Sequence, residues 1–246
     1  MNQRISANIH NLTDLWKTGS EAFQSYFEQD DYAYCYIPRS QWPNRLWLTQ
    51  ISNSTAPAKI PPLLAVHQDP MTFSFFDTTL GDGENIFSLL APYGISEKSM
   101  QWGMSFTPNK TFPADDQLTV QRISSATNME GWSVNFQLAF GYCISVETLE
   151  KTADKIEYYH LVYQNENVGT LLLHQTDGVL GIHSLGIIPA MRGKGLAKKA
   201  MYWALNKAIS RKARLVTLQA SAMAKPMYEK LGFTSEFIMR NFHLKQ

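Results

Sequence analysis

Two glycines, Gly193 and Gly195, stand where an apolar segment of the chain gives way to an amphipathic one. Residues 179–187 are short, apolar and β-branched at both ends, which favours a strand, and Pro189 lacks the backbone donor needed to continue it. After Gly195, apolar side chains recur every four residues, which predicts a helix. Glycines at a helix start let an anionic group approach unpaired amides at the positive end of the helix dipole. The segment therefore predicts a phosphate or pyrophosphate site, although the same glycines also suit an ordinary tight turn.

Three anion-binding patterns compete for this turn. A nucleotide P-loop requires Lys and then Ser or Thr after its last glycine, but Leu196 and Ala197 follow Gly195. The dinucleotide fingerprint requires a third glycine at the position of Lys198. The pattern [QR]-x-x-G-x-[GA] is satisfied by Arg192, Gly195 and Ala197. It is typical of the acetyl-CoA pyrophosphate loop of the GNAT (GCN5-related N-acetyltransferase) superfamily, which this segment resembles.

Flanking segments add to the resemblance. Ile-Ile-Pro at residues 187–189 and Tyr-Glu-Lys-Leu-Gly-Phe at residues 228–233 match the superfamily in order and spacing. The resemblance covers the chain from about Leu118 to its end. It implies an N-acyltransferase that moves an acetyl group from acetyl-CoA to a primary amine, with no metal. The alternative is a catalytically silent protein that binds or senses CoA.

The resemblance also implies roles for single residues. Backbone amides of the loop would cradle the pyrophosphate, and these belong to Arg192, Gly193, Lys194, Gly195, Leu196, Ala197 and Lys198. Main-chain groups of the preceding strand would meet the pantetheine arm and the acetyl carbonyl, and these belong to Leu185, Gly186 and Ile187. Ser221 stands where family members carry a residue that contacts the cofactor, and it would equally suit a helix N-cap. Tyr228 matches the general acid that protonates the leaving thiolate, a balanced transfer because phenols and thiols have similar pKa values.

A general base is not evident from the sequence. His183 on the predicted central strand and His174 at the end of the strand before it are the candidates. A neutral histidine can deprotonate an ammonium group directly or through water, and it can equally be a hydrogen-bonded structural residue. Members of the family often lack a dedicated base, so the question stays open.

Composition limits the function classes. The chain has 246 residues and a net charge of +1, so no general attraction to nucleic acid or membrane is expected. Residues 190–214 contain eight Lys or Arg and no acidic residue, a local field that suits the phosphates of CoA. The two cysteines form no metal or disulfide pattern, and residues 1–10 lack the apolar core of a signal peptide. We expect a cytoplasmic monomer or homodimer.

The order of elements predicts an α/β (α+β) fold with two GNAT-like domains, each a twisted mixed sheet flanked by helices. From residue 118 onward the pattern reads strand, two helices, three strands, helix, strand, helix, strand. Residues 1–112 are predicted to form a degenerate copy without the CoA loop, and residues 113–246 the acetyltransferase domain. Residues 107–116 read as the linker, and residues 51–62 as a loop. The acceptor groove is expected at the helix around Trp132 and Phe136 and at the domain interface.

Overall fold

The computed structural model describes residues 2–49, 56–67, 69–81, 84–114 and 117–244. In the N-terminal part the elements are α1 (Gln3–Glu21), β1 (Tyr26–Glu28), β2 (Tyr32–Cys35), β3 (Arg45–Leu48), α2 (Ala56–Ala65), β4 (Thr72–Asp77), α3 (Glu84–Leu90) and β5 (Ile95–Phe106). In the C-terminal part they are β6 (Leu118–Arg122), α4 (Ala126–Phe140), α5 (Val146–Thr152), β7 (Glu157–Tyr163), β8 (Glu166–Thr176), β9 (Val179–Ile187), α6 (Leu196–Ser210), β10 (Leu215–Ala220), α7 (Lys225–Leu231) and β11 (Thr234–Leu244). The mixed α/β class and the predicted C-terminal order are confirmed.

One local prediction is wrong. Residues 51–62 were expected to form a loop because of their prolines, yet α2 includes Pro61 and Pro62. Ile60 and Leu64 are buried where α2 packs on β4 and β11, and this burial outweighs the poor helix propensity of proline. Residues 51–55 lie outside the described part of the chain. The predicted linker has no regular structure from 107 to 114, and residues 115–116 are likewise outside the description.

The eleven strands of the described residues join one sheet in the order β1-β2-β3-β4-β11-β5-β10-β9-β8-β7-β6. Neighbours are antiparallel except for the parallel pairs β3–β4 and β9–β10. The last strand, β11, pairs with β4 and β5 of the N-terminal part, and β5 separates β10 from β11. The predicted domain boundary at residue 112 stays a prediction. At the centre of the sheet, strands from the N-terminal and C-terminal parts of the chain alternate.

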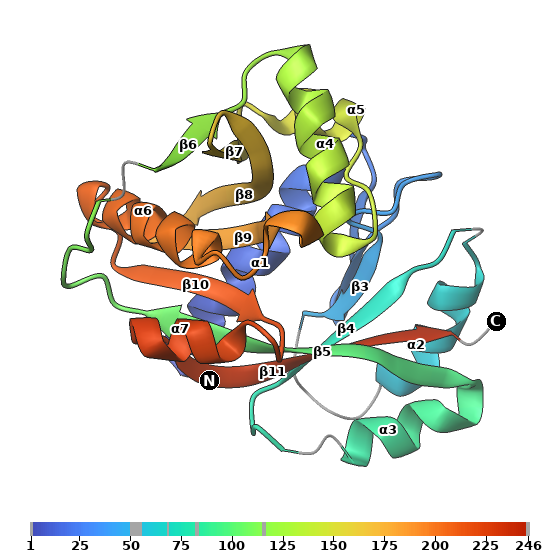
Figure 1. Cartoon of the computed structure of the whole chain (residues 1–246). Helices are drawn as coiled ribbons and strands as arrows, with labels where there is room; N and C mark the ends of the chain where they lie inside the picture. Colours follow the sequence, from blue (N-terminus) through green and yellow to red (C-terminus); the bar gives the residue numbers. More distant parts are fainter. Residues whose placement is uncertain (1, 50–55, 68, 82–83, 115–116, 245–246) are drawn as a thin grey trace.

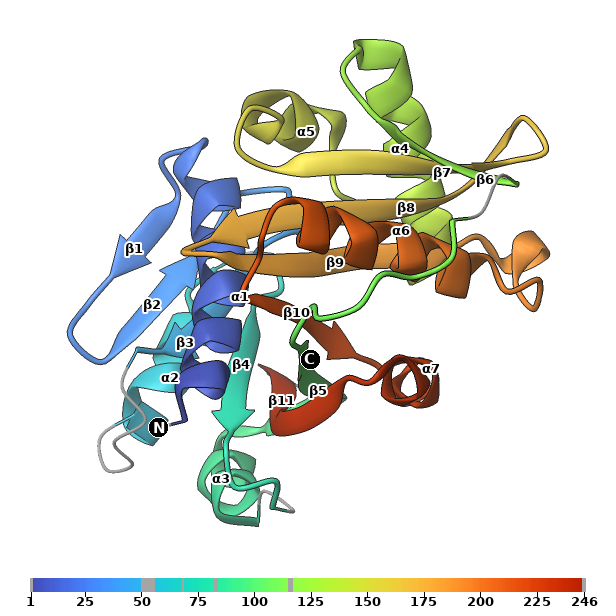
Figure 2. The same ribbon diagram turned by 90° about the vertical axis from the view of Figure 1, so that its left-hand side faces the viewer.

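Helices cover both faces of the sheet. On one face α1, α4 and α5 pack in one core around the fully buried Trp132 and Phe136. On the other face α6 and α7 cover the C-terminal strands, while α2 and α3 cover the N-terminal ones. Figure 1 shows α1 behind β9 and β10, with α6 in front of them. In the turned view of Figure 2, α1 and α7 lie on opposite sides of β10 and β5. The first helix of the chain therefore closes one face of the C-terminal strands.

Candidate active site

Strand β9 contains a bulge at its centre. The register against β8 shifts between His183 and Gly186, and Ser184 adopts a positive φ of 52°. The hydroxyl of Thr170 donates to the Ser184 carbonyl at 2.8 Å and holds the bulged peptide. A bulge re-aims the residues on either side of it, so main-chain groups of Ser184 and Leu185 leave the regular ladder.

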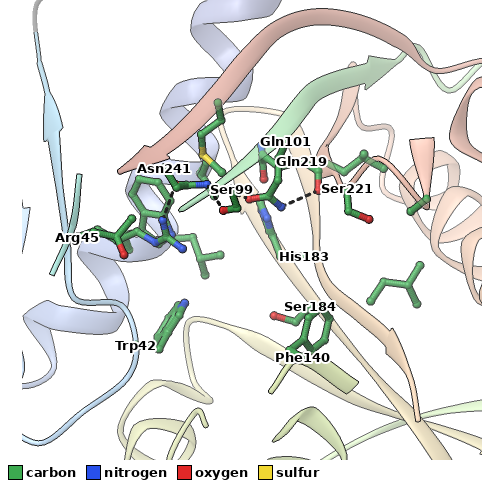
Figure 3. Close-up of a pocket in the computed structure, with 18 of the residues that line it drawn as sticks. Trp42, Arg45, Ser99, Gln101, Phe140, His183, Ser184, Gln219, Ser221 and Asn241 are labelled. Carbon is green, nitrogen blue, oxygen red and sulfur yellow. Dashed lines mark hydrogen bonds between the residues drawn. The ribbon is translucent and has the colours of Figure 1, made fainter. Parts of the chain in front are cut away.

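The bulge opens the sheet between β9 and β10. Their parallel pairing in the described sheet covers only three residue pairs and ends at Gly181 and Thr217. A cavity of about 390 Å³ lies where the two strands diverge. It is lined by residues from α1, β3–β5, the α4–α5 connection, β9, β10, α7 and β11: Leu12, Leu15, Trp16, Trp42, Arg45, Thr72, Lys98, Ser99, Gln101, Phe140, Tyr142, Ile182, His183, Ser184, Leu185, Leu218, Gln219, Ser221, Ala224, Tyr228, Met239 and Asn241. Both halves of the chain thus contribute to one site (Figure 3).

The glycine-bracketed loop leaves a row of amides without protein partners. Gly193 and Gly195 have φ values of 79° and 75°, and a Cβ at either position would meet no atom within 4 Å. In this fully described segment, the N–H groups of residues 193–198 donate to no protein acceptor. They lie at the N-terminus of α6, where the helix dipole adds positive potential. Successive amides of this kind form an anion-binding concavity.

The side chain of Arg192 does not point to this concavity as a free cation. Its Nε donates to the Ile187 carbonyl at 3.0 Å and its Nη2 to the Ala139 carbonyl at 3.0 Å. Its own amide donates to Pro189. Arg192 therefore joins the end of β9 to the end of α4, and it is exposed, as are Lys194 and Lys198.

Four of the predicted residues line the cavity, namely His183, Leu185, Ser221 and Tyr228. Gly186 and Ile187 do not line it and instead pair with β8. The Tyr228 ring packs edge-on against Phe233, and its hydroxyl has no hydrogen-bond partner among the described residues. Burial raises the pKa of Tyr228, so the phenol is neutral and holds its proton at physiological pH.

A residue of α1 sets the tautomer of His183, and burial keeps the ring neutral. The amide nitrogen of Asn11 donates to the His174 carbonyl at 3.1 Å and to Thr176 at 2.9 Å, so its oxygen must face His183. That oxygen lies 3.0 Å from Nε2 of His183, which therefore carries the hydrogen. Burial, with a smaller effect of nearby His174, lowers the pKa of His183 to about 3. His183 lines the cavity but is a weak base.

His174 is placed away from the cavity. Its Nε2 lies 2.7 Å from a carboxylate oxygen of Asp14 on α1, and the ring is 5% exposed. The hydrogen bond to His174 lowers the pKa of Asp14. His174 is absent from the cavity lining, so this pair connects α1 to β8.

The opposite end of the cavity holds polar residues that the sequence did not single out. Arg45 on β3 donates through Nη1 to Ser74 at 3.0 Å and to Asn241 at 2.9 Å. Its guanidinium carbon lies 4.8 Å from the centre of the Trp16 ring. Burial lowers the pKa of Arg45, but a guanidinium stays charged at neutral pH. No local motif marks these residues, because they lie on four separate elements.

The predicted aromatic groove is partly wrong. Trp132 and Phe136 are 0% exposed and belong to the core, because the face of α4 that carries them packs on the sheet. The aromatic residues that do line the cavity from this region are Phe140 at the end of α4 and Tyr142 just beyond it. The expected contribution from both halves of the chain agrees with the cavity lining.

Comparisons with known proteins agree with this geometry. A family model described as the acetyltransferase (GNAT) family matches residues 125–233. No curated protein matches the sequence. A GCN5-related N-acetyltransferase from Kribbella flavida is 14% identical with a TM-score of 0.71, covering 100% of this chain and 97% of its own. One from Sphaerobacter thermophilus is 16% identical with a TM-score of 0.63, covering 88% and 78%.

A conserved protein of unknown function from Staphylococcus epidermidis is 15% identical, with a TM-score of 0.62 and coverage of 89% and 93%. At these identities the structures establish the fold. Across the described residues, no helix is long and apolar enough to cross a membrane. The family match, the bulged and split strands and the loop coincide in one region of the chain. Residues 125–233 thus match the acetyltransferase (GNAT) family model, and the whole length of the chain is similar in fold to a GCN5-related N-acetyltransferase.

Proposed function

We propose that the protein transfers an acetyl group from acetyl-CoA to a primary amine of a small molecule or peptide. The family match supports acyl transfer as the general activity. The observation that supports acetyl-CoA as the donor is that the loop and the cavity both lie at the end of β9. The six unpartnered amides of residues 193–198 follow β9, and the carboxyl ends of β9 and β10 open into the cavity that contains Tyr228.

The loop would hold the pyrophosphate of CoA through backbone N–H groups. It would not need the lysine contact that a P-loop makes to its phosphates. The thioester would then extend along the edge of β9 that the divergence from β10 leaves open, past Leu185. Ser221, at the end of β10, lines the same cavity and is a candidate contact to the cofactor. The residues present therefore suit an acyl-CoA substrate.

The reaction is a direct transfer. The amine nitrogen forms a bond to the thioester carbonyl carbon, and the carbon–sulfur bond breaks. The neutral phenol of Tyr228 gives its proton to the departing thiolate. The excess proton on the nitrogen leaves to water, because His183 is a weak base and His174 lies outside the cavity, and water returns one proton to the Tyr228 phenolate.

Two measurements test this function against the silent alternative. Thiol release from acetyl-CoA is followed across a panel of primary amines, and CoA affinity is measured by calorimetry. Turnover with at least one amine, together with CoA binding, is the expected result. Tight CoA binding without turnover on any amine would favour the binding or sensing protein, and absence of both would refute the CoA site.

A further inference from the structure

Arg45 is a cation without a carboxylate partner. No ion pair to Arg45 occurs among the described residues, and both of its hydrogen bonds leave from Nη1 toward neutral oxygens of Ser74 and Asn241. A guanidinium has five N–H donors, so those on Nε and Nη2 remain for another acceptor. Arg45 lines the cavity, and the stacked Trp16 ring and the two hydrogen bonds hold its position.

The charge around the cavity has one sign. Its lining contains the cations Arg45 and Lys98 but, in the part of the chain that is described, no Asp or Glu. Lys98 is exposed, whereas Arg45 lies among Trp16, Ser74 and Asn241. A fixed guanidinium presents paired donors that match the two oxygens of a carboxylate. The cavity is therefore built for a ligand that carries a negative charge at this end.

The cation lies at the far end of the cavity from the proposed reaction centre. Figure 3 places Arg45 and Asn241 on one side, Ser221 on the other, and His183 between them. The volume of about 390 Å³ is in the range of small-molecule sites. A ligand that spans it would have its anionic group at Arg45 and its nucleophile near Leu185 and Tyr228.

We propose that the acceptor is a small amino-carboxylate, such as an amino acid whose amine and carboxylate lie far enough apart to span the cavity, and that its carboxylate pairs with Arg45. This inference rests on the proposed acetyl transfer and adds the class of acceptor to it. A neutral amine of the same shape would leave the guanidinium unpaired in a partly closed site, which costs binding free energy. Recognition of the carboxylate would thus select the acceptor.

The experiment compares L-amino acids with their α-carboxamides, which keep the amine and lose the charge. Thiol release is measured for the wild-type full chain and for Arg45→Gln, Arg45→Lys and Arg39→Gln. We expect wild type to prefer the acids, and Arg45→Gln to raise their KM by about 10- to 100-fold with kcat changed much less. Arg45→Lys should give an intermediate KM, because lysine keeps the positive charge but lacks the paired N–H donors of the guanidinium. Arg39→Gln is the matched control, because Arg39 is exposed and does not line the cavity, and it should stay within about threefold of wild type.

Equal kcat/KM for acids and amides in wild type would overturn the inference while leaving the acetyltransferase proposal intact. A rise in the KM of acetyl-CoA alone in Arg45→Gln would assign the cation to a CoA phosphate and also overturn it. A preference for O-phosphoethanolamine over every carboxylate would replace the carboxylate by a phosphate. If no amine is turned over, calorimetry with the acid and amide pairs decides whether Arg45 binds carboxylates, independently of the reaction.

Thermal unfolding of each variant checks that the protein still folds, because Arg45 also forms hydrogen bonds to Ser74 and Asn241. If Arg45→Gln does not fold, the wild-type comparison of acids with amides and the Arg45→Lys variant still test the proposal.

Discussion

At the scale of single residues, Tyr228 is the side chain whose role is most sharply tested. Tyr228→Phe keeps the ring against Phe233 and removes only the hydroxyl. Because that hydroxyl has no partner among the described residues, the substitution should not destabilise the fold. We expect kcat to fall by roughly tenfold to a thousandfold while CoA affinity changes little. Steady-state rates and calorimetry measure the two effects, and full turnover across a range of pH would remove the general-acid role.

His183 should make the stability of the protein depend on pH. Its pKa of about 3 in the fold lies below its usual value of 6.5, so the unfolded chain binds the proton more readily. The neutral ring makes its full contribution to the free energy of unfolding above pH 6.5, and this contribution is lost as the pH falls from there toward 3. Between pH 6.5 and 5 the loss is roughly 2 kcal/mol.

The measurement is urea unfolding at pH 7.5, 6, 5.5 and 5 for wild type and His183→Gln. Both proteins share the other histidines and acids, so the difference between their pH slopes isolates this side chain. We expect His183→Gln to lose less stability on acidification than wild type. Parallel slopes would mean that His183 is protonated in the folded protein.

At the scale of elements, a substitution in the loop before α6 tests CoA binding separately from folding. Gly195 and Gly178 both have a φ of 75°, but Gly178 lies in the turn between β8 and β9. Valine at either position should cost about 1–2 kcal/mol of folding free energy because of its left-handed backbone. Only Gly195→Val should abolish CoA binding, since its branched Cβ would stand in front of the loop amides.

Calorimetry with CoA and thermal unfolding of both variants provide the comparison. Equal CoA affinity in Gly195→Val and Gly178→Val would show that the loop does not hold the pyrophosphate.

At the scale of the whole molecule, the interleaved strands predict that the two halves do not fold apart. A fragment of residues 113–246 would lose β5, which lies between β10 and β11, and would expose the face covered by α1. Leu12, Leu15 and Trp16 of α1 are each at most 5% exposed, so much apolar surface depends on that helix. We expect the fragment to show no cooperative unfolding transition.

Co-expression with residues 1–112 should restore a folded complex that elutes as one species. A fragment of residues 113–246 that unfolds cooperatively and binds CoA by itself would instead make residue 112 a true domain boundary.

The sequence by itself determined the features that depend on neighbouring residues. Pro189, the glycines at 193 and 195 and the four-residue apolar repeat after them specify a strand, a turn and a helix through local backbone preferences. The same local rules predicted the order of elements from residue 118 onward. They failed at α2, where burial of Ile60 and Leu64 overrides proline.

Only the tertiary structure decided how distant segments meet. The bulge at Ser184 depends on the register against β8, and the tautomer of His183 depends on Asn11, which lies 172 residues earlier in the sequence. Arg45 and Asn241 meet at the cavity because β4 pairs with β3 on one side and with β11 on the other. Long-range strand pairing leaves no periodic signal in a single sequence, since each strand satisfies the same alternation with any partner. The proposed CoA loop could therefore be predicted from the sequence, whereas the proposed acceptor end of the site could not.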